Sequence, residues 1–133
     1  MTRAILAVLG IGKGTWGHIA RLITEEEWDK ILLVGNEWGR ENFSPFKKEG
    51  PDGKPVPEKE LDWILVNNRV GFGILKDTIK EKLPDVDEIC VSLISGSGKE
   101  HIALLAALRE SGKKFKLVIL SKGETGQACP QYF

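Results

Sequence analysis

One stretch of the chain combines a small-residue loop with lysine and histidine side chains. The loop, Ser95-Gly96-Ser97-Gly98, follows the apolar run Ile89–Ile94, and Lys99 and His101 come directly after it. Glycines let the backbone approach a ligand closely, and the hydroxyl, ammonium and imidazole groups add hydrogen-bond donors. Where such a loop opens a helix, free backbone N–H groups and the helix dipole favour an anion. The stretch predicts an anion-binding loop, and the alternative is a plain strand-to-helix turn.

A second loop of this kind lies near the start of the chain. Gly10-Ile11-Gly12-Lys13-Gly14-Thr15 follows the apolar run Arg3–Leu9. Its three glycines, Lys13 and Thr15 are candidate ligand contacts. Trp38 stands in a polar stretch, 35–43, after the apolar run 30–34, and is a candidate for stacking on a base. Ordinary packing is the alternative for Trp38.

Neither loop fits the common nucleotide-binding motifs. A P-loop needs a Ser or Thr after its Gly-Lys pair, but Glu100 follows Lys99 and Gly14 follows Lys13. The spacing Gly10-x-Gly12-x-Gly14 also differs from the dinucleotide fingerprint, although Glu37 lies at about the right distance to hold a ribose hydroxyl. Hydrolysis of ATP or GTP by a P-loop mechanism is therefore not expected.

The composition excludes several further classes of protein. Lys and Arg total 19, as do Asp and Glu, so the net charge is zero and binding to long nucleic acid is not favoured. No apolar run is long enough to span a membrane. The spacing of Cys90 and Cys129 and of the two histidines suits no metal site, so neither a metal nor a cofactor is expected. A reduced, cytoplasmic protein fits best.

Apolar runs alternate with helical segments along the chain, which predicts an α/β fold in one domain, residues 1–133. Strands are expected at 3–9, 30–34, 61–66, 88–94 and 115–120, and helices at 16–23, 72–83 and 99–109, with another turn or short helix starting at Thr24. Residues 44–60 hold four of the six prolines and predict an exposed loop that could act as a lid, and 121–133 form a C-terminal tail.

These elements fit a Rossmann-like, mostly parallel five-stranded sheet of order 3-2-1-4-5 with helices on both faces. Strands 3–9 and 88–94 are then central neighbours. The chain reverses direction between them, and ligands bind at such switch points. Both glycine loops are predicted to converge on one crevice there.

The helix after Gly98 is apolar all the way round from Ile102 to Leu108, where a surface helix shows a single stripe. One side packs on the sheet, and the other needs a cover from the tail or from a second subunit. The small alanines suit close helix packing, which favours a two-fold homodimer through helix 99–110.

The motif I-S-G-S-G-K-E-H-I, residues 94–102, between a buried strand and an alanine–leucine helix, resembles the signature of CRISPR-associated Rossmann-fold (CARF) domains. The order of elements is similar along the whole chain, whereas only 95–101 matches as a motif. The resemblance implies a homodimer that binds a cyclic oligoadenylate, usually the four-membered ring, across its two-fold axis. By position, Ser95, Gly96, Ser97, Gly98 and Lys99 would hold phosphates and riboses, and the loop 10–15 would line the pocket floor.

The resemblance implies either a stand-alone sensor or a ring nuclease, which cleaves the messenger without a metal by attack of a ribose 2′-hydroxyl on the neighbouring phosphate. Lys99 is then the candidate for charge stabilisation, and Ser97, Thr15 and His101 are candidates for orienting the hydroxyl or moving a proton. The rivals are a non-catalytic module that binds a nucleotide or another anion, and a scaffold subunit with an empty crevice.

Overall fold

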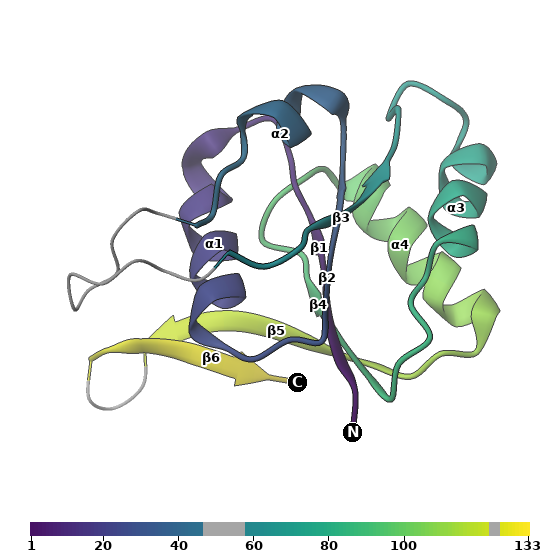
Figure 1. Cartoon of the computed structure of the whole chain (residues 1–133). Coiled ribbons are helices and arrows are strands. Elements are labelled where there is room, and N and C mark those ends of the chain that lie inside the picture. The colour runs from purple at the N-terminus through teal and green to yellow at the C-terminus, as the bar shows by residue number, and fades with distance from the viewer. Residues whose placement is uncertain (47–57, 123–125) are drawn as a thin grey trace.

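The computed structural model describes residues 1–46, 58–122 and 126–133. Its centre is a six-stranded sheet of order β3-β2-β1-β4-β5-β6 (Figure 1). The strands are β1 (Arg3–Val8), β2 (Lys30–Gly35), β3 (Asp62–Leu65), β4 (Glu88–Ser92), β5 (Phe115–Lys122) and β6 (Ala128–Tyr132). The helices are α1 (Trp16–Glu25), α2 (Glu37–Asn42), α3 (Phe72–Glu81) and α4 (Gly98–Ser111), and a 3₁₀ turn spans Lys13–Thr15.

The predicted order of the first five strands and their parallel pairing are confirmed. Strand β1 lies between β2 and β4, with Leu6 opposite Leu32 on one side and opposite Val91 on the other. The continuous apolar run of β1 is explained by its position, because helices cover both faces of the sheet and its side chains from Ala4 to Val8 are fully buried. The central strands therefore hold the glycine loops at the same edge.

The expected C-terminal tail is in part a strand, which corrects the prediction of five strands. Strand β6 pairs antiparallel with β5 and closes that edge of the sheet, with Val118 opposite Tyr132. The Tyr132 hydroxyl accepts from Arg3 Nη2 at 3.1 Å and donates to Glu26 Oε1 at 2.6 Å. These bonds attach β6 to the start of β1 and to the end of α1.

Two shorter elements also differ from expectation. The polar stretch after β2 forms the helix α2, which Asn36 caps by accepting from the Gly39 N–H at 2.8 Å. No helix begins at Thr24, because α1 continues through it and its hydroxyl donates to the Ala20 carbonyl at 2.9 Å. Most of the expected loop 44–60 lies outside the described residues.

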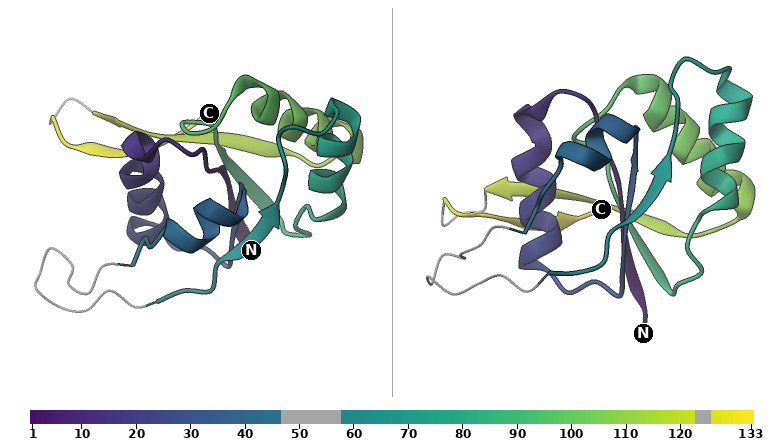
Figure 2. Two further views of the ribbon diagram at one scale, coloured as in Figure 1. Left: turned by 90° about the horizontal axis from the view of Figure 1, so that it is seen from above. Right: turned by 45° about the horizontal axis from the view of Figure 1, so that its top comes forward.

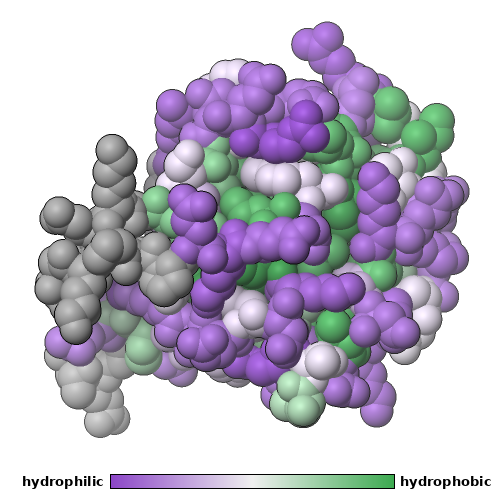
Figure 3. Space-filling view, in the orientation of Figure 1, coloured by the Kyte–Doolittle hydropathy of each residue, from purple (hydrophilic) through white to green (hydrophobic). Residues whose placement is uncertain are grey.

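Helices lie on both faces of the sheet, α1 and α2 on one and α3 and α4 on the other, as Figure 2 shows. In the view of Figure 3, apolar side chains are visible between polar ones over the edge strand β3. No helix of the described residues is long and apolar enough to cross a membrane.

The cover of α4 comes from α3, and not from the tail. Leu75 and Ile79 of α3 belong to the same buried cluster as Leu104 and Leu108 of α4. The apolar run of α4 is thereby largely accounted for within one chain. Among the large apolar side chains of α4, Ile102 is the exposed one, with 60% of its surface accessible.

His18 joins α1 to β5. Its Nε2 accepts a hydrogen bond from the Leu120 N–H at 2.9 Å, so the ring is neutral in the fold. Burial, with a contribution from the nearby charge of Arg21, lowers the pKa of His18. The bond to Leu120 gives His18 a structural role.

We expect the free energy of unfolding to fall as the pH drops from about 7.5 to about 5.5. The unfolded chain binds a proton at His18 near the ordinary pKa of about 6.5, whereas the fold binds it only at lower pH. The stabilisation is therefore complete above that value and lost as the pH falls below it. Denaturant titrations at several pH values measure the slope, and His18→Gln, which keeps an acceptor for Leu120, should reduce it. An unchanged slope in this variant would refute the assignment.

Candidate functional site

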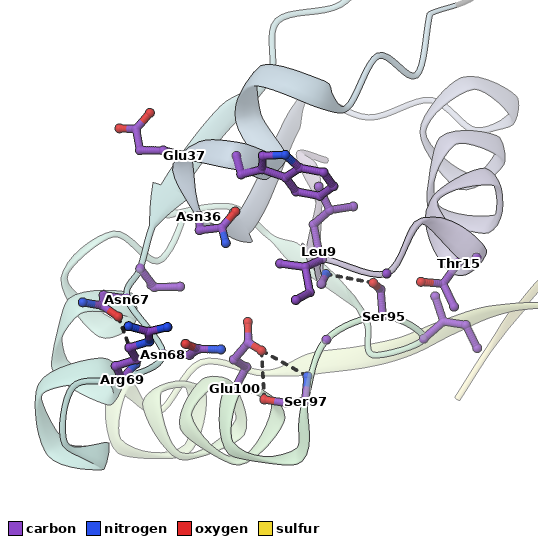
Figure 4. A pocket seen from close by; sticks show the side chains of 18 residues that line it. Leu9, Thr15, Asn36, Glu37, Asn67, Asn68, Arg69, Ser95, Ser97 and Glu100 are labelled. Carbon is purple, nitrogen blue, oxygen red and sulfur yellow. Dashed lines mark hydrogen bonds between the residues drawn. The ribbon is translucent and has the colours of Figure 1, made fainter.

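A cleft of about 1030 Å³ opens at the carboxyl ends of β1, β2, β3 and β4 (Figure 4). The segment after each of these strands supplies part of its lining, as expected for a parallel sheet at its switch point. Its lining residues are Leu9, Gly10, Ile11, Gly12, Gly14, Thr15, Asn36, Glu37, Trp38, Val66, Asn67, Asn68, Arg69, Ile94, Ser95, Gly96, Ser97 and Glu100.

The two glycine loops touch at the floor of the cleft. The Gly10 N–H donates to Ser95 Oγ at 2.8 Å, and Ser95 is only 3% exposed. A Cβ on Gly10 would lie 2.8 Å from Gly96 N. Gly96 has a φ of +95°, which is unfavourable for other residues, and a Cβ there would overlap Cγ1 of Val8. The convergence of the loops predicted from the sequence is confirmed, and the contact joins the Gly10 backbone to the Ser95 hydroxyl.

One wall of the cleft is aromatic. Trp38, in α2, lines the cleft and is 41% exposed. The centroid of the Trp16 ring lies 5.5 Å from that of the Trp38 ring. The Trp16 indole N–H donates to the Gly10 carbonyl at 2.9 Å. Lys13 Nζ lies 5.6 Å from each of the two ring centroids. The wall offers the partly exposed ring of Trp38, with the positive charge of Lys13 near it.

The opposite wall is polar, and the sequence patterns considered above did not identify it. Asn67, Asn68 and Arg69, in the loop between β3 and α3, all line the cleft. No ion pair of Arg69 occurs within the described ranges 1–46, 58–122 and 126–133. The sequence nevertheless indicates this wall. The polar run Asn67-Asn-Arg69 follows a predicted strand, so it must lie at the same edge of the sheet as the glycine loops.

The N-terminus of α4 is capped from within the chain. Glu100 Oε1 accepts from the Ser97 N–H at 3.1 Å and from the Ser97 hydroxyl at 2.8 Å. Glu100 is 6% exposed and lines the cleft, and Figure 4 shows its carboxylate between Ser97 and the cavity. The free donors expected at this helix start are thus partly used by a carboxylate, which disfavours an anion bound directly against it.

Lys99 and His101 point to backbone carbonyls. Lys99 Nζ donates to the carbonyls of Asn68 at 2.7 Å and Val70 at 2.6 Å. His101 Nε2 lies 2.6 Å from the Ser95 carbonyl, an oxygen that can only accept, so Nε2 carries the proton. Neither side chain lines the cleft.

The structure therefore brings together most of the predicted site residues. Gly10, Gly12, Gly14, Thr15, Trp38, Ser95, Gly96 and Ser97 line the cleft, whereas Lys13, Gly98, Lys99 and His101 lie beside it. Glu37 also lines the cleft, and its Oε2 forms an ion pair with Arg40 Nη2 at 2.5 Å. Among the described residues, no group of three or more His, Cys, Asp or Glu side chains is placed to hold a metal ion.

We expect Gly96→Ala to lower the free energy of unfolding by roughly 1–3 kcal/mol, because of the positive φ and the overlap with Val8. The matched control is Gly98→Ala, whose Cβ has no atom within 4 Å. It should leave stability unchanged or raise it by about 0.5 kcal/mol. Thermal unfolding of both variants is the measurement, and equal melting temperatures would contradict this account of the loop crossing.

Comparison with known proteins gives the fold. No family model and no curated protein sequence matches the chain. Csm6 of Enterococcus italicus, solved with cyclic hexa-2′-fluoro-hexa-dAMP, superposes with a TM-score of 0.57 at 16% identity, over 91% of this chain and 34% of Csm6. Can2 of Sulfobacillus thermosulfidooxidans, solved with cyclic tetra-adenylate, superposes with a TM-score of 0.59 at 10% identity, over 96% of this chain and 36% of Can2.

The chain thus spans about a third of the length of each of these two proteins. At such identities the likeness concerns the fold alone. The strand order, the helices on both faces and these two superpositions agree, and the chain has a CARF-like Rossmann fold.

Proposed function

We propose that this domain binds a cyclic oligoadenylate in the cleft at the carboxyl ends of β1–β4. The observation that carries the proposal is the meeting of two glycine loops at the switch point, beneath an exposed tryptophan and opposite an asparagine- and arginine-bearing loop. Two proteins of similar fold were solved with cyclic adenylate rings, which supports this class of ligand.

The chemistry of the cleft matches the parts of such a ring. Trp38 offers a stacking surface for adenine, and base stacking on an aromatic side chain contributes about 1–3 kcal/mol. Arg69, on the polar wall, supplies positive charge for a phosphate, and Lys13, beside the cleft near Trp38, can supply a second charge. Hydroxyls of Thr15 and Ser97, with the Glu100 carboxylate, can bond ribose hydroxyls. The volume of about 1030 Å³ is at the upper end of ordinary small-molecule sites, and so favours a ligand larger than one nucleotide.

We infer that the protein acts as a homodimer through α4 and that the ring has four members. A ring with two-fold symmetry, placed on a two-fold axis, meets each loop twice. A dimer through α4 would bury Ile102, a large apolar side chain of this helix that is 60% exposed.

Two versions of this function differ in their product. In the ring nuclease, a ribose 2′-oxygen attacks the adjacent phosphorus, its proton passes to a base, and the 5′-oxygen leaves and takes a proton from water, which gives a 2′,3′-cyclic phosphate. Thr15, Ser97 and Glu100 are the groups of the cleft that could serve this step, and Lys99 and His101 would first have to leave their carbonyls. The binding-only sensor is favoured by the positions of these two side chains.

We expect cyclic tetra-adenylate at about a hundred times its dissociation constant to stabilise the fold by roughly 2.7 kcal/mol, or on the order of 10 °C in melting temperature. Cyclic hexa-adenylate, ATP and NAD should give smaller shifts. Trp38→Ala should weaken ring binding by about 5- to 150-fold for each of the two copies of Trp38 that the shared ring meets, whereas Trp38→Phe, which keeps a stacking surface, should lose less. Chromatography of the mixtures detects cleavage: linear products indicate the nuclease and intact rings the sensor. No shift with either ring would reject the proposal.

For the dimer, light scattering should give twice the chain mass of 14.7 kDa for the wild type. Ile102→Glu should give the monomer, because a carboxylate would be buried in the interface. Ile74, on α3, is 62% exposed and provides a matched control, so Ile74→Glu should remain dimeric. A wild-type monomer, or the same mass for both variants, would contradict an interface at α4.

A further inference from the structure

The ammonium of Lys99 ties two parts of the fold that are distant in sequence. Lys99 lies in the first turn of α4, and the carbonyls it bonds, Asn68 and Val70, belong to the loop between β3 and α3. Two of the three N–H donors of Lys99 therefore bond to carbonyl oxygens, at Nζ–O distances of 2.7 and 2.6 Å. A lysine whose role is to contact a ligand phosphate would keep its donors directed at the cleft.

The loop that Lys99 holds is the polar wall of the cleft. Inside the loop, Asn67 Oδ1 accepts from the Arg69 N–H at 3.0 Å, and the Val70 N–H donates to the Asn67 carbonyl at 3.3 Å. At its start, the Val66 N–H donates to the Gly35 carbonyl at 2.9 Å. Within the part of the chain that the structure describes, the Lys99 bonds are the hydrogen bonds that tie 67–70 to another element.

The side chains of this loop are of types that recognise the base and the phosphate of a nucleotide. A carboxamide can pair with adenine through its N6 amino group and N7, which guanine and hypoxanthine do not match. A guanidinium binds phosphate through paired donors. Asn67, Asn68 and Arg69 all line the cleft, and Figure 4 shows them across the cavity from Thr15.

We propose that Lys99 is a positioning residue, which fixes the loop Asn67–Val70 so that Asn67 and Asn68 select adenine while Arg69 binds a phosphate. This rests on the proposed function and adds the source of its base selectivity. The competing role, in which the Lys99 ammonium binds a phosphate directly, makes a different prediction for the salt dependence of binding. Removing one cation that binds a phosphate reduces the slope of log affinity against log salt by about 0.7 for a single strand.

The test compares Lys99→Met, which keeps the aliphatic stem, with Arg69→Met and with Lys114→Met as a control. Lys114 is exposed and lies in the turn before β5, at the opposite edge of the sheet from the cleft. The probes are cyclic tetra-adenylate and the same ring with inosine in place of adenosine, which lacks the N6 amino group. Dissociation constants are measured for both rings at several salt concentrations.

The wild type and Lys114→Met should bind the adenosine ring at least about 10-fold more tightly than the inosine ring. Lys99→Met should lose this preference with an unchanged salt slope, and Lys99→Arg, which can also donate to two carbonyls, should restore it. Arg69→Met should keep the preference and show a slope smaller by about 1.4, because the shared ring meets one Arg69 from each of two chains. A reduced slope with the preference intact in Lys99→Met would show that Lys99 binds a phosphate and overturn the inference, as would a wild type that does not distinguish the rings.

Binding of neither ring by the wild type would reject the proposed function, and a ligand-free measurement then decides the role of Lys99. Amide hydrogen exchange at Arg69 and Val70 should be at least about 10-fold faster in Lys99→Met than in Lys114→Met, because the bonds within the loop lose their support. Equal exchange rates in the two variants would show that Lys99 does not position the loop.

Discussion

The close contact between the loops after β1 and β4 determines the architecture of the cleft. The Gly10 N–H reaches Ser95 Oγ, and neither Gly10 nor Gly96 has room for a side chain. Because the floor is made of backbone and small residues, it cannot carry long functional groups. The groups that can distinguish one ligand from another come from the periphery, from Trp38 of α2 and from the loop after β3.

The distribution of charge follows from this arrangement. Arg69 stands on the polar wall and Lys13 lies beside the cleft, near Trp38, while the carboxylate of Glu100 lies at the start of α4, where an anion was expected. A site built for a lone phosphate would gather its cations at one point. Separated cations, a stacking surface and acceptors for hydroxyls suit a ligand that alternates phosphate, sugar and base. The geometry thus accounts for the absence of the standard phosphate-binding motifs.

The sequence predicted the features that depend on pattern. Buried strands and glycine loops indicated the strand order and the convergence of residues 10–15 and 95–98, because the ends of parallel strands share one edge. The direction of long side chains was not predictable. Lys99 and His101 follow a glycine loop, yet each side chain forms a hydrogen bond with a backbone carbonyl and does not line the cleft. Strand β6 was not predicted because its short segment, with Pro130 and little alternation, acquires its order from pairing with β5.

The central claim, a ring shared between two copies of the cleft, is tested most directly by the stoichiometry of binding. Isothermal titration calorimetry with cyclic tetra-adenylate should give one ring for every two chains, with an affinity that falls as salt increases. A ratio of one ring per chain would contradict the shared site. The absence of binding at ring concentrations that saturate other proteins of this fold would contradict the assignment of the ligand.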